Sequence, residues 1–250
     1  MIYRSRGQAS RETGISYLGS VNLTAKHIKA FKYNELTYSL YLSPADTSGY
    51  EVCPLRTKEC THACLNESGL NKIDTKHNKI NKSRISKTKL FFENRDFFMS
   101  WIIDEITAAK NKANRLGMRF SVRLNNTSDI SPEQFSINGK NILEIFNDSQ
   151  FYDYSKVYRR IDLAKKYNNY DLTFSYSGDN KEDCIRAIEE DNTRVAVVFK
   201  DEIPKKFWGY DVLGGDEYDM RYYDPKDIII GLLFKEVRNE IDFENSSFVN

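Results

Sequence analysis

Three of the four cysteines in the 250-residue chain lie close together, and they set the chemistry to consider first. Cys53, Cys60 and Cys64 are separated by six and then by three residues. Such clustering arises either from a disulfide framework or from a shared metal site. Because thiols stay reduced in the cytoplasm, the cluster in a cytoplasmic protein favours a metal site.

Two kinds of metal centre suit this segment, and the sequence leaves both open. An iron–sulfur cluster takes cysteine thiolates, and a cluster iron that lacks a fourth protein ligand can bind a small molecule. A structural Zn²⁺ site has four ligands, so His62, His77 or an exogenous group would complete it. Cys184 lies on an apolar helical stripe with Ala187 and Ile188, which indicates a buried structural residue.

The composition is typical of a soluble globular protein, with 40% hydrophobic and 29% charged residues. No apolar run approaches the roughly 20 residues that cross a bilayer. The polar stretch from Met1 to Gly14 carries three arginines and does not resemble a secretory signal. We therefore expect a cytoplasmic protein with no membrane partner.

The net charge of +1 is unevenly distributed. Up to residue 130 there are 21 Lys and Arg against 12 Asp and Glu, and after it there are 16 against 24. The basic excess is concentrated between Lys72 and Arg95. Such a stretch can bind nucleic acid through its phosphates, or it can simply be a solvated helix face. The acidic second half offers a surface for a protein partner.

Strand and helix patterns alternate along the chain. Apolar and β-branched runs predict strands at residues 36–42, 119–124, 150–154, 172–176, 194–200 and 228–234. The strongest helical pattern runs from Arg95 to Gly117, where glycine is a natural C-cap. This alternation predicts parallel strands joined by right-handed crossovers.

We expect these strands to form an α/β barrel with parallel strands, either closed or an incomplete (βα)6-type barrel. The Cys-rich loop would follow the first strand, and an open doubly wound sheet is the alternative. Residues 36–235 would form this single domain, after an N-terminal arm at 1–35 and before a polar tail at 236–250.

Polar residues follow the predicted strands, and ligands of parallel α/β folds bind beyond the carboxyl ends of the strands. We therefore expect a small-molecule ligand there. The candidates for acid–base chemistry are Lys156, Asp129 and Tyr154. The candidates for cofactor binding are Arg123, Asn125, Ser175 and Asp216. Some of these residues have a structural alternative. Asp129 could pair with Arg123, Lys156 could be a surface lysine, and Asp216 could cap a turn.

Several blocks of sequence resemble one phage-encoded family. The blocks are Cys53–Asn66, Arg84-Ile85 with Lys87–Phe92, Arg123–Asn125 with Thr127–Ile130, Phe151–Lys156, Leu172–Ser175, Val195–Phe199, and Gly215–Glu217 with Asp219, Arg221 and Asp224. Over about Leu36 to Leu233, the chain is similar to the mycobacteriophage "gene product eighty-eight" type of domain. The resemblance implies a phage or prophage origin, and so the cytoplasm of a host cell, but it implies no particular reaction.

Three cysteines after the first strand of an α/β barrel also resemble the radical S-adenosylmethionine enzymes, although the usual spacing in that superfamily is shorter. This resemblance implies a [4Fe–4S] cluster on the cysteines, with S-adenosylmethionine near Arg123, Asn125 and Lys156. Three functions stay open. They are an iron–sulfur enzyme, a zinc-stabilised phage protein that binds or processes nucleic acid, and a non-enzymatic phage protein that binds a host factor.

Overall fold

The computed structural model describes residues 1–22, 24–64, 79–235 and 246–250. The chain divides into two compact units. The first comprises Met1–Val52 and Lys79–Phe151, and the second comprises Cys53–Asn78 and Tyr152–Asn250. Strand β6 contributes its first two residues to the first unit and the rest to the second.

The first unit is built on strands β1, β2, β3 and the start of β6. Its elements are α1 (Arg6–Thr13), β1 (Gly19–Ser20), α2 (Ala25–Lys32), β2 (Glu35–Leu40), α4 (Lys79–Glu93), α5 (Arg95–Leu116), β3 (Arg119–Arg123), the 3-10 helix η3 (Pro132–Gln134), β4 (Ser136–Ile137), β5 (Lys140–Asn141), α6 (Ile142–Ile145) and the first residues of β6 (Gln150–Ser155). Residues 1–35, predicted to be an arm, thus contribute two helices and a strand to this unit.

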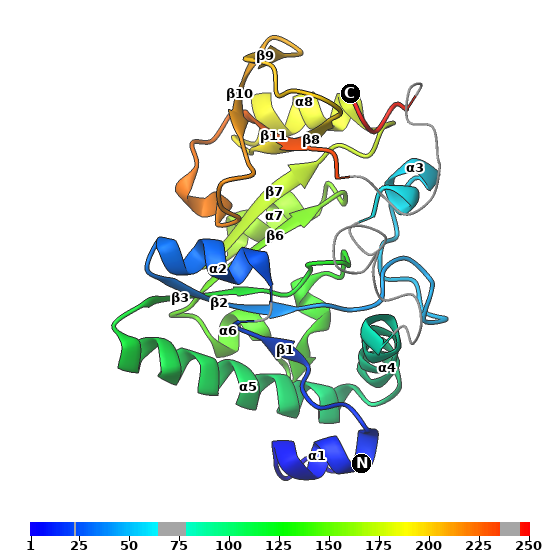
Figure 1. Cartoon of the computed structure of the whole chain (residues 1–250), viewed down its shortest axis with the longest axis vertical. Coiled ribbons are helices and arrows are strands. Elements are labelled where there is room, and N and C mark those ends of the chain that lie inside the picture. Colours follow the sequence, from blue (N-terminus) through cyan, green and yellow to red (C-terminus); the bar gives the residue numbers. More distant parts are fainter. Residues whose placement is uncertain (23, 65–78, 236–245) are drawn as a thin grey trace. The chain divides into compact units, whose positions relative to one another are not determined.

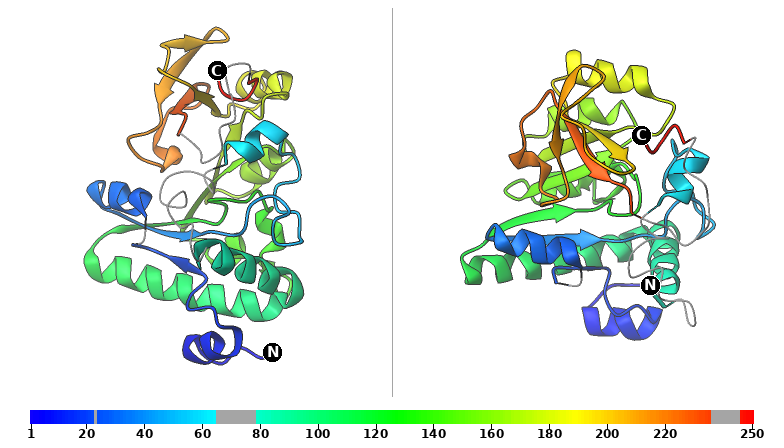
Figure 2. Two further views of the ribbon diagram at one scale, coloured as in Figure 1. Left: turned by 45° about the vertical axis from the view of Figure 1, so that its right-hand side comes forward. Right: turned by 45° about the horizontal axis from the view of Figure 1, so that its top comes forward.

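Helix α5 confirms the strongest helical pattern in the sequence. It ends at Leu116, and Gly117 adopts the left-handed conformation with φ of 64°, where glycine carries no Cβ penalty. Its apolar face buries Trp101, Ile102 and Ile106 completely. Each such side chain contributes roughly 1.5–3 kcal/mol by leaving water. Helices α2 and α5 lie on opposite sides of β2 and β3 (Figures 1 and 2).

A buried carboxylate on α5 ties this helix to the start of the chain. Glu105 is 7% exposed and accepts hydrogen bonds from Leu18 N at 2.9 Å, from Gly19 N at 2.9 Å and from the Tyr38 hydroxyl at 2.6 Å. Because a buried charge is tolerated only when it is well hydrogen-bonded, these donors are what allow Glu105 to lie in the core. Burial raises the pKa of Tyr38, and the charge of Glu105 and the hydrogen bond to its carboxylate raise it further.

The second unit carries the cysteine segment and the later strands. Its elements are α3 (Lys58–His62), the rest of β6, α7 (Arg160–Lys166), β7 (Tyr170–Ser175), α8 (Lys181–Glu189), β8 (Val195–Phe199), β9 (Lys206–Phe207), β10 (Tyr210–Gly214), the 3-10 helix η4 (Arg221–Tyr223) and β11 (Ile229–Leu233). Strand β8 is almost wholly buried, as its continuous apolar run predicted. The β9–β10 hairpin extends beside β11 (Figure 2).

The strand order corrects the predicted closure. Hydrogen-bonded neighbours follow the order β1-β2-β3-β6-β7-β8-β11-β10-β9, and this order does not close within the part of the chain that the structure describes. The sheet is mostly parallel, with antiparallel pairs at its two ends, β1–β2 and β9–β10. Successive parallel strands are neighbours, as in a barrel, but closure needs a ladder between the first and last strands. A closed barrel is therefore not found among the described residues, whereas the α/β class with a mostly parallel sheet is confirmed.

The predicted polar tail is only partly described, because residues 236–245 lie outside the described ranges. In the described remainder, Phe248 is 8% exposed and Val249 is 4% exposed. Val249 also forms a parallel bridge with Val198 of β8. The end of this stretch is therefore packed, which its polar composition did not predict.

Candidate functional site

The cysteine segment belongs to the second unit, and a threonine fixes its helix there. Thr57 is the N-cap of α3, and its hydroxyl accepts a hydrogen bond from Cys60 N at 3.1 Å. The same hydroxyl donates to the carbonyl of Ser177 at 2.8 Å. Because Ser177 follows the end of β7, this pair of bonds holds α3 at the carboxyl end of that strand.

The three cysteines are half-buried rather than enclosed in the core. Cys60 lies on α3 and Cys64 follows the helix, whereas Cys53 precedes it. Cys184, by contrast, is fully buried on α8, as the apolar stripe predicted. Burial raises the pKa of the Cys184 thiol to about 12, so that thiol is chemically inert at neutral pH.

Cysteine thiolates are chemically suitable ligands for a metal centre, but the described residues do not form an assembled set of ligands. Within the described ranges, no group of three His, Cys, Asp or Glu side chains is arranged to hold a metal ion. His62, one candidate fourth ligand, is exposed on α3, and His77 lies outside the described residues. The shared metal site thus stays a prediction.

Glu59, next to Cys60, is a residue that the sequence did not single out. Its carboxylate accepts hydrogen bonds from Ser246 Oγ at 2.9 Å, Ser247 Oγ at 3.2 Å and Phe248 N at 2.9 Å. Partial burial acts to raise the pKa of Glu59, but these hydrogen bonds outweigh it and the pKa lies below its ordinary value. No sequence signal joins residue 59 to residues nearly two hundred positions later.

Three predicted site residues in the second unit come from the ends of β6 and β7. Tyr154 and Lys156 are half-buried, and Lys156 Nζ lies 6.0 Å from the centre of the Phe248 ring. Ser175 ends β7 and is 8% exposed, and its carbonyl accepts a hydrogen bond from Asn180 Nδ2 at 3.1 Å. Lys156 and the α3 cysteine Cys60 therefore both border Phe248, because Cys60 packs against the same apolar pair of residues, Phe248 and Val249.

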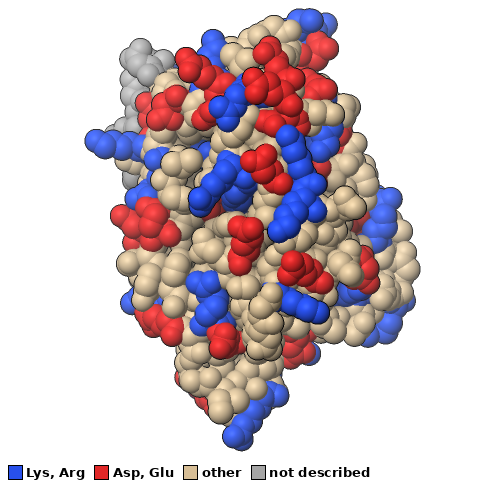
Figure 3. Space-filling view, turned by 180° about the vertical axis from the view of Figure 1, so that it is seen from behind, with Lys and Arg blue, Asp and Glu red and all other residues tan. Residues whose placement is uncertain are grey.

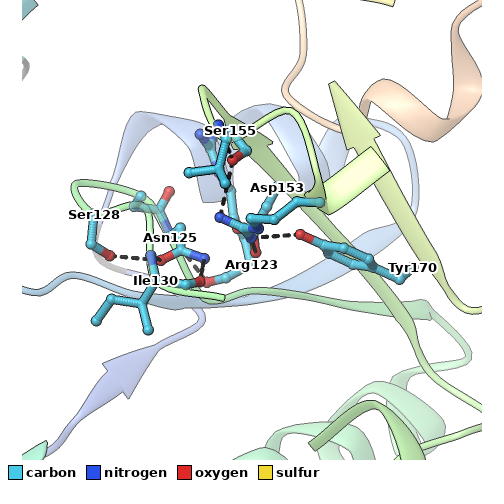
Figure 4. Close-up of polar contacts among 10 residues, drawn as sticks. Arg123, Asn125, Ser128, Ile130, Asp153, Ser155 and Tyr170 are labelled. Carbon is cyan, nitrogen blue, oxygen red and sulfur yellow. Dashed lines mark hydrogen bonds and ion pairs between the residues drawn. The ribbon is translucent and has the colours of Figure 1, made fainter. Parts of the chain in front are cut away.

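Other polar groups near these strand ends have structural partners. Arg160 is 2% exposed and donates to Tyr170 OH at 2.7 Å and to Ser155 Oγ at 3.2 Å (Figure 4). Its guanidinium also lies 3.7 Å from Asp153 Oδ2, and both side chains are buried. This network satisfies Asp153 within the fold, so the polarity at the end of β6 is partly structural.

Asp216 also has a structural contact. Its Oδ2 accepts a hydrogen bond from Leu233 N at 2.9 Å, which joins the loop after β10 to the end of β11. The neighbouring Gly215 approaches β11 closely, because a Cβ there would lie 2.5 Å from Ile230 Cγ2. This contact gives Asp216 a structural role between two segments of the sheet, which differs from the predicted turn cap, and its predicted role in cofactor binding stays untested.

The remaining predicted residues, Arg123, Asn125 and Asp129, belong to the first unit. Asn125 is 2% exposed, and its amide organises its own loop. Its Oδ1 accepts from Ser128 Oγ and from Ile130 N, and its Nδ2 donates to the Ile130 carbonyl, each at 2.9 Å (Figure 4). These three hydrogen bonds indicate a structural role for Asn125, which the sequence did not predict.

Arg123 ends β3 and is 5% exposed, while Asp129 is half-buried and its N–H donates to the Val52 carbonyl at 2.7 Å. The predicted pairing of these two side chains is not tested by the contacts of the described loop. Their proposed roles in binding and catalysis stay predictions.

The basic segment is divided between surface and core. Lys79, Lys82 and Lys89 of α4 are exposed, but Arg84 is 8% exposed and Lys87 only 5%. The Lys87 ammonium lies 4.6 Å from the centre of the Tyr17 ring, and burial lowers the pKa of Lys87 to about 8.

One face of the molecule shows basic and acidic side chains interspersed rather than segregated (Figure 3). Arg84 and Lys87 of α4 are buried and so are unavailable to phosphate. The face in Figure 3 offers no extended surface of one charge.

No helix in the described ranges has the length and apolar character needed to cross a bilayer. The fold and the strand-end side chains define a mostly parallel α/β protein with a cysteine-bearing helix at the carboxyl end of β7. The chain belongs to the Gene product 88 family, a phage protein family, which matches residues 9–243. This confirms the family resemblance seen in the sequence, while the likeness to radical S-adenosylmethionine enzymes is not shown. No curated protein and no solved structure matches the chain.

Proposed function

We propose that this protein is a metal-dependent enzyme in which Cys53, Cys60 and Cys64 hold an iron–sulfur cluster. The observation that carries the proposal is the attachment of α3 to the end of β7 through Thr57 and Ser177. It attaches the helix that carries Cys60 to the carboxyl end of β7, and the carboxyl ends of parallel strands are where α/β proteins bind their ligands.

The type of donor supports a cluster or zinc above other metals. Thiolates are soft ligands that select iron–sulfur clusters, zinc or copper(I), whereas magnesium and calcium take oxygen ligands. The half-buried state of all three cysteines leaves them accessible to an entering metal. Three thiolates on a [4Fe–4S] cluster leave one iron open for a small cofactor, for which S-adenosylmethionine is our candidate.

Residues of the second unit would complete the site. Lys156 lies beside the same apolar residues as Cys60, and its ammonium suits a carboxylate or phosphate group on the ligand. Tyr154 lies near the end of β6, and Lys156 directly follows that strand in a bend. We propose that Lys156 binds the anionic part of the small molecule, with Tyr154 and Ser175 as its polar neighbours.

The test is metal analysis of protein purified without oxygen. A [4Fe–4S] protein should be brown, with about four irons and as much acid-labile sulfide per chain. Cys60→Ser should lose most of this iron, whereas Cys184→Ala, which changes the buried cysteine of α8, should keep it. A colourless protein with one zinc per chain would support the zinc-stabilised alternative instead, and a protein that binds neither metal would refute both.

The nucleic-acid alternative has weaker support from the described residues. Arg84 and Lys87, two cations of the basic segment, are buried against the rings of Tyr41 and Tyr17. Binding to DNA or RNA that weakens steeply with salt would nevertheless favour it. We find no specific contact that favours the host-factor alternative.

A further inference from the structure

The segment Ser246–Asn250 extends the sheet where β7 stops. On the β7 side of β8, the carbonyls of Arg194 and Ala196 accept hydrogen bonds from the N–H groups of Phe174 and Tyr176 of the β7 chain, each at 2.9 Å. The next carbonyl in this row, that of Val198, accepts from Asn250 N at 3.0 Å. Lys200 N in turn donates to the Asn250 carbonyl at 2.8 Å. The segment therefore occupies the crevice that opens between the carboxyl ends of β7 and β8.

This position is one that parallel α/β folds usually leave for a ligand. Here an extended piece of the same chain fills it by adding main-chain hydrogen bonds, as a bound peptide does when it pairs with an open strand. The chain end lies beside α3 (Figures 1 and 2).

A carboxylate on the cysteine helix holds the segment in place. Glu59 receives three hydrogen bonds from Ser246, Ser247 and Phe248, and it is the immediate neighbour of Cys60. On the β7 side, Gly178 has a φ of +104°, and a Cβ there would lie 2.8 Å from Ser247 Oγ and 3.2 Å from Phe248 N. The loop after β7 is thus shaped to let the segment approach, since only glycine fits without strain.

The apolar residues of the segment cover the thiol helix directly. Phe248 and Val249 form a small buried cluster, and Cys60 and Ala63 of α3 pack against it together with Val198 and Phe234. The Phe248 ring also lies beside the Lys156 ammonium. One five-residue segment therefore contacts both a proposed metal ligand and the proposed anion-binding lysine.

We propose that Ser246–Asn250 is a cover over the cysteine site, which opens without unfolding of the second unit and controls the access of solutes to Cys60. The importance of the cover for activity rests on the proposed function, but the packing of the segment against Cys60 is a property of the fold. The two claims can therefore fail separately.

The experiment measures the rate at which iodoacetamide alkylates individual cysteines in metal-free, reduced, full-length protein, read by mass spectrometry. Phe248→Ala removes the ring that covers Cys60 and should speed alkylation of Cys60 about tenfold or more, the factor expected when a buried ring no longer favours closure. Cys184 reports unfolding, because it is fully buried in α8 and should stay unreactive in the same sample.

Three further variants sharpen the test. Glu59→Ala removes the acceptor of all three hydrogen bonds and should also raise the rate at Cys60, whereas Glu59→Gln keeps one acceptor oxygen and should raise it less. Phe146→Ala is the matched control, because Phe146 is 7% exposed, as buried as Phe248 at 8%, but belongs to the first unit.

The inference is overturned if Phe248→Ala leaves the Cys60 rate unchanged, or if Cys60 and Cys184 become reactive together. It is equally overturned if Phe146→Ala raises the Cys60 rate as much as Phe248→Ala does. Metal content is measured separately on unmodified protein, so absence of metal would remove the proposed function and leave the shielding result intact.

Discussion

The buried Lys87 predicts that the destabilising cost of its own charge disappears as the solution turns alkaline. Burial lowers the pKa of Lys87 from 10.5 to about 8, and the nearby charge of Glu105, which acts to raise it, does not compensate. The charge of Arg84 acts in the same direction as burial. At neutral pH the folded protein therefore carries a buried ammonium that the unfolded chain would keep in water.

The direction of the effect follows from proton linkage. Because the pKa of Lys87 is lower in the folded state, the unfolded chain holds more protons between pH 8 and pH 10.5. The contribution of Lys87 to the free energy of unfolding therefore rises with pH across that window, and below pH 8 the full cost of the charge remains. A pKa difference of about 2.5 corresponds to about 3 kcal/mol.

The perturbation is Lys87→Met, which keeps an unbranched side chain and removes the charge. It relieves the cost of about 3 kcal/mol but loses the contact with the Tyr17 ring, worth roughly 1 kcal/mol. At pH 7 the variant should thus be more stable than the natural protein by about 2 kcal/mol. By pH 10.5 this advantage should disappear, because Lys87 is then neutral in the folded protein and half neutral in the unfolded chain, so little of the cost remains.

The assay is urea unfolding of both proteins at a series of pH values from neutral to alkaline. Comparing the variant with the natural protein cancels the titration of all other groups that the two share. Lys89→Met, an exposed lysine on the same helix, should show no such pH-dependent difference. The reasoning is refuted if Lys87→Met is less stable at pH 7, or if its difference from the natural protein does not change with pH.

Four other substitutions test contacts inside the units by urea unfolding. Glu105→Ala leaves three donors without their acceptor and should cost about 3 kcal/mol or more, whereas Tyr38→Phe, which removes one donor, should cost about 1 kcal/mol; equal costs would contradict this. Asn125→Ala should cost about 2–4 kcal/mol because three hydrogen bonds of its loop are lost, and a cost below 1 kcal/mol would show that the loop does not depend on them. Gly215→Ala should cost about 1–3 kcal/mol through its clash with Ile230, and unchanged stability would show that β11 yields to the methyl group.

Local patterns in the sequence determined much of this protein. The helical repeat of α5 and its glycine cap predicted both ends of that helix, and the apolar run at Val195–Phe199 predicted a buried strand. The family, the α/β class and the burial of Cys184 were also predicted. These features depend on residues that are neighbours in the chain, or on sequence similarity itself, so the sequence contains them directly.

Tertiary structure decided what depends on distant residues. Whether the sheet closes depends on hydrogen bonds between its first and last strands, and no local pattern carries that information. Lys87 in a polar helix has the pattern of a surface lysine, and only packing against Tyr17 places it in the core. Phe248 lies in a polar stretch. It is buried because Glu59 accepts a hydrogen bond from its backbone N–H and the next residue, Val249, pairs with Val198 of β8. A side chain's surroundings are supplied by segments far along the chain, and these meet only when the chain folds.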